Sequence, residues 1–423
     1  MKPMKNKIAA FSSGLNLNDW SIIFILFTSI ISLNLVPLGF ILWILTFYLN
    51  KNTVTIKSIF SGLGKWFLLY YIVLLLGMLW TENDSFGLSK LENKLSFLLI
   101  PILFTISHFS ISRKQFMNVL LFSLLMSLLI NYGLALYKYF TLTESSLYDS
   151  LINANFSQLM HRSYYCNYLI IGCIVILDRL FKKENKWLYL ILFALFSIGI
   201  FQTLAKSGIL IYFILIPAFL FWQLLKTKQY KAILISLLGF VISIFFLAKV
   251  DNPIKTRFQL IPDAIENFES KNNPSTESNT SRLLMWSTSI DIFNEFPILG
   301  VGTGDYDDVL TSVNERYGNS GVAIHRYNSH NQFLNTTVQL GLLGLVVLIT
   351  LFLYGFKMAY QQRNIIGLFT LSCFFLNFLF ESFIESQAGI ILFCLLTIAI
   401  FYLKPKTNRY HNGLTPIPKE NFK

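Results

Sequence analysis

Long apolar runs, separated by short polar segments, recur along most of this 423-residue chain. A helix needs about 20 predominantly apolar residues to cross a bilayer, and fewer where the membrane is thin. Only 13% of the residues are charged, whereas a typical soluble domain has about 25%. We therefore predict an all-α polytopic membrane protein with about twelve spans. The predicted spans are 20–34, 37–49, 64–80, 95–109, 116–138, 164–178, 187–204, 207–224, 232–248, 333–356, 364–380 and 387–403.

The first two spans form one apolar stretch, residues 20–49, that is interrupted by Asn34, Pro37 and Gly39. Proline disrupts a helix interior, because it lacks the amide hydrogen and clashes with the preceding turn. Two short helices in a tight hairpin fit this pattern, and one long kinked span is the alternative.

The distribution of basic residues favours the hairpin. With twelve spans and a cytoplasmic N-terminus, 22 of the 34 Lys and Arg residues fall on the inner side, as the positive-inside rule requires. One long span at 20–49 would invert every later segment. The net charge of +12 is then explained by cytoplasmic loops and indicates no nucleic-acid partner. A basic start followed by no small-residue cleavage site predicts that the first span is retained.

The expected organisation follows from this topology. Both termini are cytoplasmic, and one long outward (periplasmic) loop carries surface helices. The segments are a tail at 1–19, spans one to nine at 20–248, the loop at 249–332, spans ten to twelve at 333–403 and a tail at 404–423.

One helix is expected inside the long loop, on the outer membrane surface or across the spans. Leu283, Trp286, Ile290 and Phe293 share one helical face. Ser281 could cap this helix, and Pro297 should end it.

The stretch "PILGVGTGDYDDV" follows this helix. A dinucleotide-binding motif needs a strand before its glycines and a helix after them. These glycines lie in a loop instead, so a dinucleotide-binding site is not favoured. We expect them instead to permit a tight backbone path close to another element or a ligand. Asp305, Asp307 and Asp308 could hold a divalent cation against a nucleotide sugar. Because nucleotide sugars are cytoplasmic and this loop faces outward, acidic turn residues are the favoured interpretation.

Two basic residues on the outer side are candidates for binding an anion. Lys206 stands where two spans meet with almost no loop, and a charge at membrane depth is costly unless it has a function. Snorkelling to the headgroups is the alternative for Lys206. Arg282 lies near the predicted helix start, where free amides favour anions. A solvated surface arginine is the alternative for Arg282.

The polar run "HRYNSHN" precedes the tenth span and supplies a candidate base. His330 stands at the junction with the span, and Arg326 and Asn331 are its neighbours. Histidine titrates near neutral pH, which suits general-base catalysis. His325 and His330 are too few for a metal centre. His108 and His411 are interpreted as incidental.

Further polar candidates lie at two span ends. His161 and Arg162 begin the sixth span. Glu381 and Glu385 lie at the outer end of the eleventh, four residues apart on one helical face, where they could orient a cation across a cavity or simply line a wet loop. The four cysteines all lie in apolar runs and are expected to be buried hydrophobes.

Two stretches, "SRLLMWSTSIDIFNEFPILGVGTGDY" and "HNQFLNTTVQLGLLGL", resemble the O-antigen ligase and polymerase superfamily of bacterial envelope glycosyltransferases. The shared pattern is Arg, Trp four residues later, Pro-x-x-Gly-x-Gly-x-Gly, and then His-Asn before Gly-x-x-Gly. "LLLGMLWTENDSFGLSKLENKLSFLLIPILF" and "HRSYYCNYL" resemble earlier family stretches. The likeness spans roughly residues 66 to 403 and does not separate ligase from polymerase.

The resemblance implies a GT-C-like membrane enzyme that moves a glycan from undecaprenyl pyrophosphate onto an acceptor hydroxyl, such as that of lipid A core, at the outer face of the inner membrane. It implies His330 as base, with Lys206 and Arg282 on the pyrophosphate. Because the outer loop lacks a convincing set of ligands, we also expect no metal, and no cofactor is expected. The family usually has arginine where this chain has Lys206. A polymerase, a ligase acting on protein, and a flippase for lipid-linked glycans are the alternatives.

Overall fold

The computed structural model of the chain describes residues 14–49, 62–141, 146–228, 252–266 and 268–405, together with the single residues 231 and 249. Within these ranges every regular element is a helix, as predicted, and no strand occurs. The predicted ninth span, 232–248, and most of both predicted tails lie outside the described residues.

The apolar runs of the first half form helices close to the predicted ranges. These are α2 (Leu17–Ile31), α3 (Val36–Leu49), α5 (Gly64–Gly77), α7 (Ser96–Ile106), α8 (Arg113–Thr141), α11 (Arg162–Phe181), α12 (Lys186–Gln202) and α13 (Lys206–Lys226). Shorter elements lie between them: η1 (Leu33–Leu35), η2 (Met78–Trp80), α6 (Asp84–Asn93), α9 (Leu147–Ser150) and α10 (Asn153–Phe156). The second half holds α15 (Pro253–Glu266), α16 (Ser278–Glu295), α17 (Tyr306–Arg316), α18 (Ser320–Ile324), α19 (Gln332–Gln361), α20 (Ile365–Phe378), η3 (Phe383–Glu385) and α21 (Gln387–Tyr402).

Four of the helices in the described part of the chain, α8, α11, α13 and α19, are long and apolar enough to cross a membrane. Six shorter apolar helices accompany them. The molecule is therefore built as a multi-pass membrane protein, while the count of twelve spans stays a prediction. Residues 20–49 form two helices, because the backbone leaves the helical region at Ser32 (φ −157°, ψ 102°).

The largest apolar core lies between the long helices. Helices α11 and α21 are buried along almost their whole length, and α11 packs against α12, α13 and α20. All four cysteines are buried in these helices and none forms a disulfide, as expected for small hydrophobic side chains.

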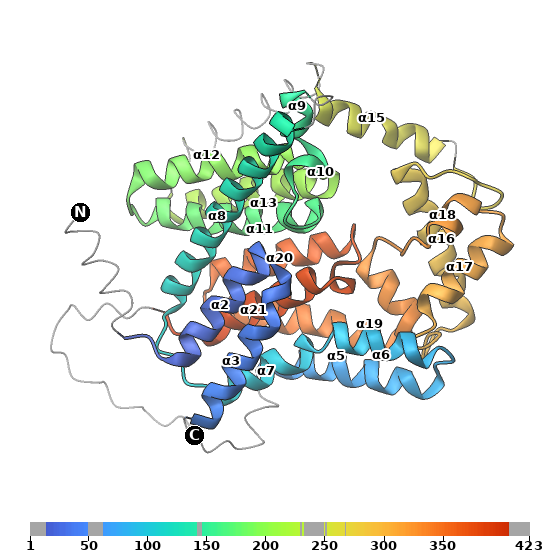
Figure 1. Cartoon of the computed structure of the whole chain (residues 1–423), viewed down its shortest axis with the longest axis horizontal. Coiled ribbons are helices and arrows are strands. Elements are labelled where there is room, and N and C mark those ends of the chain that lie inside the picture. The colour runs from blue at the N-terminus through green and yellow to red at the C-terminus, as the bar shows by residue number, and fades with distance from the viewer. Residues whose placement is uncertain are drawn as a thin grey trace.

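A second, smaller apolar core belongs to the predicted outward loop. It joins α16, α17 and α18 to the first half of α19 through Leu284, Tyr306, Val322 and Val338. Figure 1 shows these helices gathered at the right-hand end of the molecule, with α15 above them and α6 below. The long loop is thus a folded helical unit that rests on α19.

The sequence prediction for α16 needs one correction, at the start of the helix. The helix begins at Ser278 rather than near Ser281, because the Glu277 carboxylate accepts the backbone N–H groups of Asn279 (2.6 Å) and Thr280 (2.9 Å). The side of the helix that is buried in the protein carries Leu284 and Ile292, whereas Leu283 and Trp286 of the predicted apolar face line an apolar hollow described below. The helix ends at Glu295, before Pro297, as predicted.

Helix α19 is broken at Gly341, where φ is 60° and ψ is −156°. The segment after α16 crosses the break and bonds to its backbone. The Val301 N–H donates to the Val338 carbonyl (2.9 Å), and the Leu342 N–H donates to the Pro297 carbonyl (2.8 Å). Backbone groups freed by a helix break inside a membrane protein need such partners.

Two glycines make this crossing possible. A Cβ on Gly300 would lie 2.5 Å from the Gly341 nitrogen, and a Cβ on Gly341 would lie 2.3 Å from the Ile298 carbonyl oxygen. Both residues also have positive φ values, which side-chain-bearing residues adopt at a cost. The tight backbone path expected for the glycine-rich stretch is confirmed, and its neighbour is another element of the same chain.

Candidate active site

A polar hollow of about 210 Å³ lies where five parts of the chain meet. They are the first turns of α11, α13 and α16, the loop before α19, and the segment between α20 and α21. The charged and polar side chains that line it include His161, Arg162, Ser163, Lys206, Arg282, Tyr327, His330 and Glu381. Six of these eight residues were candidates from the sequence. The first and the last of them, His161 and Glu381, are 220 positions apart in the chain.

His330 directly precedes Asn331, the N-cap of α19, and has a strained backbone conformation. Its φ is +44°, and a non-glycine residue held there costs on the order of 1–3 kcal/mol. Two contacts hold the loop in place. The Asn328 side-chain oxygen accepts the His330 N–H at 2.9 Å, and the buried Tyr306 hydroxyl accepts the Ser329 N–H at 2.9 Å. Strain maintained in this way is typical of functional positions.

Glu381 joins the candidate base to a candidate cation. One carboxylate oxygen lies 3.4 Å from His330 Nδ1, and the other accepts from Arg282 at 3.0 Å and from the Ser163 hydroxyl at 2.9 Å. Burial by itself would raise the pKa of Glu381. The hydrogen bond to His330 and the charge of Arg282 outweigh burial and lower this pKa to about 2. The carboxylate is therefore ionised and can hold the Nδ1 hydrogen of the imidazole.

Lys206 begins α13 and reaches across to the start of α16. Its Nζ donates to the Asn279 side-chain oxygen at 2.9 Å and lies 3.9 Å from a Glu277 carboxylate oxygen. The ammonium group is thus held beside the hollow by the polar cap of α16, with 14% of its side chain exposed.

A second, apolar hollow of about 200 Å³ adjoins the first. Lys206, Ser207 and Arg282 line both. Its other walls are almost entirely apolar and come from α13, α15 and α16, together with Phe380. The two candidate cations therefore stand at the boundary between a polar compartment and an apolar one.

His161 and Arg162 also line the polar hollow. His161 precedes α11, and burial lowers its pKa below the ordinary value, although the charge of Glu381 acts in the other direction. Its imidazole is accordingly neutral near pH 7. Arg162 contacts the Asn153 side chain. Both residues therefore lie next to the other candidate residues of the hollow.

Three sequence candidates lie outside this hollow. Arg326 pairs with Asp308 on the exposed surface of the loop. Asn331 caps α19, its side-chain oxygen accepting from the N–H groups of Phe333 (3.0 Å) and Leu334 (3.1 Å). Glu385 belongs to a separate buried cluster with Lys90 and Lys94.

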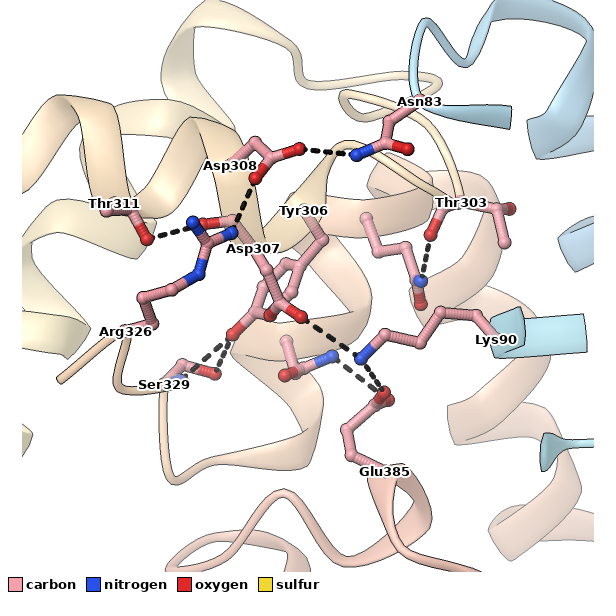
Figure 2. Close-up of polar contacts among 12 residues, drawn as sticks. Asn83, Lys90, Thr303, Tyr306, Asp307, Asp308, Thr311, Arg326, Ser329 and Glu385 are labelled. Carbon is pink, nitrogen blue, oxygen red and sulfur yellow. Dashed lines mark hydrogen bonds and ion pairs between the residues drawn. The ribbon is translucent and has the colours of Figure 1, made fainter. Parts of the chain in front are cut away.

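The three aspartates after the glycines have partners in the protein. Asp305 accepts the backbone N–H groups of Glu82 (2.9 Å) and Asn83 (2.8 Å). Asp307 pairs with Lys90, and Asp308 pairs with Arg326 (Figure 2). No group of three or more potential ligands that could hold a metal occurs within the ranges the structure covers. These contacts fit the interpretation as structural acidic residues.

Sequence reasoning missed Lys90 of α6, Lys94 at the end of that helix, and the hydroxyls of Ser163 and Tyr306. A signal existed for the lysines. Short outer loops are poor in Lys and Arg, so Lys90 and Lys94, four residues apart in one such predicted loop, are as unusual in the sequence as Lys206.

Comparison with known proteins finds a family model that matches part of this chain. The family model for O-antigen ligase matches residues 190–349. This part of the chain is therefore similar to the O-antigen ligase family. Lys206, Arg282 and His330 all lie inside the matched residues, whereas His161, Glu381 and Glu385 lie outside them.

The resemblance to the O-antigen ligase superfamily is thereby confirmed. The chain is also 26% identical over 304 residues to an uncharacterized protein of Haemophilus influenzae, covering 70% of this chain and 71% of that relative. The name of that protein describes no reaction, so the function proposed below is based on the family match and the geometry of the site.

Proposed function

We propose that this protein is a metal-independent glycosyltransferase of the inner membrane. It moves a glycan from undecaprenyl pyrophosphate onto an acceptor hydroxyl, such as that of lipid A core, at the periplasmic face. The observation that carries the proposal is the joint placement of a His–Glu pair and two cations at the boundary of a polar and an apolar hollow. A lipid-linked sugar has this same division between a charged head and an apolar tail.

In this proposal the donor spans the two hollows. Its pyrophosphate lies at the boundary, beside Lys206 and Arg282. The first isoprene units of its tail occupy the apolar hollow, where α15 supplies Phe258, Ile261 and Ile265. The sugar to be transferred lies in the polar hollow, beside His330. Charge at this depth is stabilised by a phosphate partner.

His330 acts as the general base. With its Nδ1 hydrogen directed at Glu381, the Nε2 lone pair is available to the acceptor, a tautomer that we assign from the contacts. The acceptor oxygen attacks the anomeric carbon of the sugar while its proton passes to Nε2. The bond from that carbon to the phosphate oxygen breaks, and undecaprenyl pyrophosphate leaves with the bonding electron pair.

Electrostatics favour both halves of this step. Glu381 stabilises the imidazolium that forms, and the two cations stabilise the negative charge that develops on the leaving pyrophosphate. A single displacement inverts the anomeric configuration and needs no covalent intermediate. Product stereochemistry is therefore part of the proposal.

A polymerase of the same superfamily is the second candidate, because it would use the same donor and the same base. A flippase is disfavoured by the His330–Glu381 contact, since moving a lipid-linked glycan across the membrane needs cations but no base.

Deletion of the gene followed by surface-glycan profiling separates these functions. A ligase predicts that all capped lipid A core disappears. Capping by single repeat units would instead establish a polymerase. An unchanged surface glycan would contradict both transferase functions under the conditions tested.

A further inference from the structure

Glu385 lies in a second buried polar cluster, next to the site but outside its hollow. Its carboxylate, with 8% of the side chain exposed, lies within hydrogen-bonding reach of four donors. They are Lys94 (2.6 Å), Asn335 (3.1 Å), Lys90 (3.3 Å) and Gln332 (3.5 Å). Lys90 also pairs with Asp307 at 3.3 Å. Figure 2 shows Lys90 between the carboxylates of Asp307 and Glu385.

The cluster joins four elements that are distant in sequence. Lys90 lies on α6, and Lys94 is the first residue after this helix. Asp307 lies on α17, Gln332 and Asn335 lie on the first turn of α19, and Glu385 ends η3. Lys94 is the most enclosed member, with 1% of its side chain exposed, and it also donates to the Gln339 side chain at 3.4 Å. Two lysines and two carboxylates balance each other's charge inside the protein.

The segment from Glu381 to Glu385 docks along the start of α19 through three successive contacts. His330 faces Glu381 at 3.4 Å, the Gln332 side-chain oxygen accepts the Ile384 N–H at 2.9 Å, and Asn335 donates to Glu385 at 3.1 Å. The proposed catalytic pair is the first of these contacts, and the Lys94–Glu385 pair fixes the last. A shift at Glu385 would therefore be transmitted to Glu381, four residues away.

We propose that Lys94 and Glu385 are positioning residues that hold Glu381 at its distance from His330. This inference rests on the function proposed above. A buried ion pair adds little to stability compared with apolar side chains of the same size, but it can fix one arrangement among several. Misplacement of a reacting group by about 1 Å can cost about a hundredfold in rate.

The test is the kinetics of glycan transfer by Lys94→Met and Glu385→Gln in purified full-length protein, with an undecaprenyl-pyrophosphate-linked glycan as donor. We expect kcat to fall about tenfold or more, while KM and donor binding change little. Glu92→Gln is the matched control, because it removes a carboxylate from the exposed face of α6 and should leave kcat unchanged.

A double-mutant cycle with His330→Ala distinguishes positioning from general damage to the fold. If Glu385 acts through His330, Glu385→Gln should cause no further loss in the His330→Ala background. An equal loss in both backgrounds, or a normal kcat for both single variants, would overturn the inference. Normal transfer by His330→Ala itself would instead overturn the proposed function.

A charge left alone in the interior can prevent folding. Where a single variant does not accumulate in the membrane, the double variant Lys94→Gln/Glu385→Gln carries the same test. It replaces both charges by amides that can still hydrogen-bond. We expect it to accumulate and to show the same lowered kcat with unchanged donor binding. A wild-type kcat would overturn the inference.

Discussion

The imidazole of His330 and the carboxylate of Glu381 face each other at 3.4 Å, although the two residues are 51 positions apart. Glu381 in turn contacts Arg282, at 3.0 Å. In the proposed mechanism, the base, the group that orients it and a cation for the leaving group are thereby linked through one carboxylate. Losing that carboxylate should affect both stability and transfer.

Glu381 should make the protein sensitive to acid. Its pKa is lowered from 4.5 to about 2, so the stabilisation from its ionised form is fully present above pH 4.5 and is lost as pH falls towards 2. A shift of this size corresponds to about 3 kcal/mol. Melting temperatures in detergent between pH 6 and pH 3 should therefore fall more steeply for the wild type than for Glu381→Gln. Parallel curves would show that the carboxylate is not held in this way.

Lys206 and Arg282 should each contribute to donor binding. A charge-assisted hydrogen bond is worth about 1.5–3 kcal/mol, so Lys206→Ala and Arg282→Ala should each weaken donor binding or turnover by roughly tenfold or more. Lys206→Arg should retain activity, since arginine keeps the positive charge and adds donors. Binding of the lipid-linked donor to each purified variant provides the measurement. Wild-type behaviour of Lys206→Ala would favour a lysine that only snorkels.

The apolar hollow should set the affinity for the lipid tail. Ala264 of α15 lines this hollow, and Ala264→Trp would fill it. Excluding one isoprene unit removes a few buried carbons, at about 0.8 kcal/mol per CH₂, so KM for the lipid-linked donor should rise roughly tenfold while kcat changes little. Gln259→Trp, at an exposed position of the same helix, is the control. Equal KM values for the two variants would place the tail elsewhere.

Transfer should proceed without a divalent metal. The pyrophosphate already meets two protein cations in our proposal, and Asp305, Asp307 and Asp308 are each engaged by protein partners. Purified protein should therefore keep its activity in excess chelator. Complete loss of activity, restored by Mg²⁺ or Mn²⁺, would return these aspartates to the reaction.

Much of the fold was predictable because apolar length and charge distribution act locally along the chain. The hairpin at 20–49 illustrates this, since Pro37 and the positive-inside pattern both favoured two helices. The buried face of α16 was not predictable in the same way. The apolar spacing indicates the face with Leu283 and Trp286, and these two residues line the apolar hollow. The opposite face, with Leu284, packs in the smaller core.

The site was predictable where a residue was anomalous by itself. Lys206 between two spans and His330 at a span end both stood out, and both line the hollow. Arg326 and Glu385 were chosen because they are close to these residues in sequence, yet their partners are Asp308 and Lys94. Such pairings are set by the crossing of α17, α19 and the segment before α21, which no local pattern encodes.

The most direct measurement is in vitro glycan transfer by His330→Ala, with donor binding determined separately. General-base catalysis is typically worth about 10² to 10⁴ in rate. We predict that this variant folds and binds the lipid-linked donor but transfers glycan at least about a hundredfold more slowly. His325→Ala, which removes an exposed histidine of the same loop, should remain close to the wild type. Near-normal transfer by His330→Ala would contradict the assignment of His330 as the base.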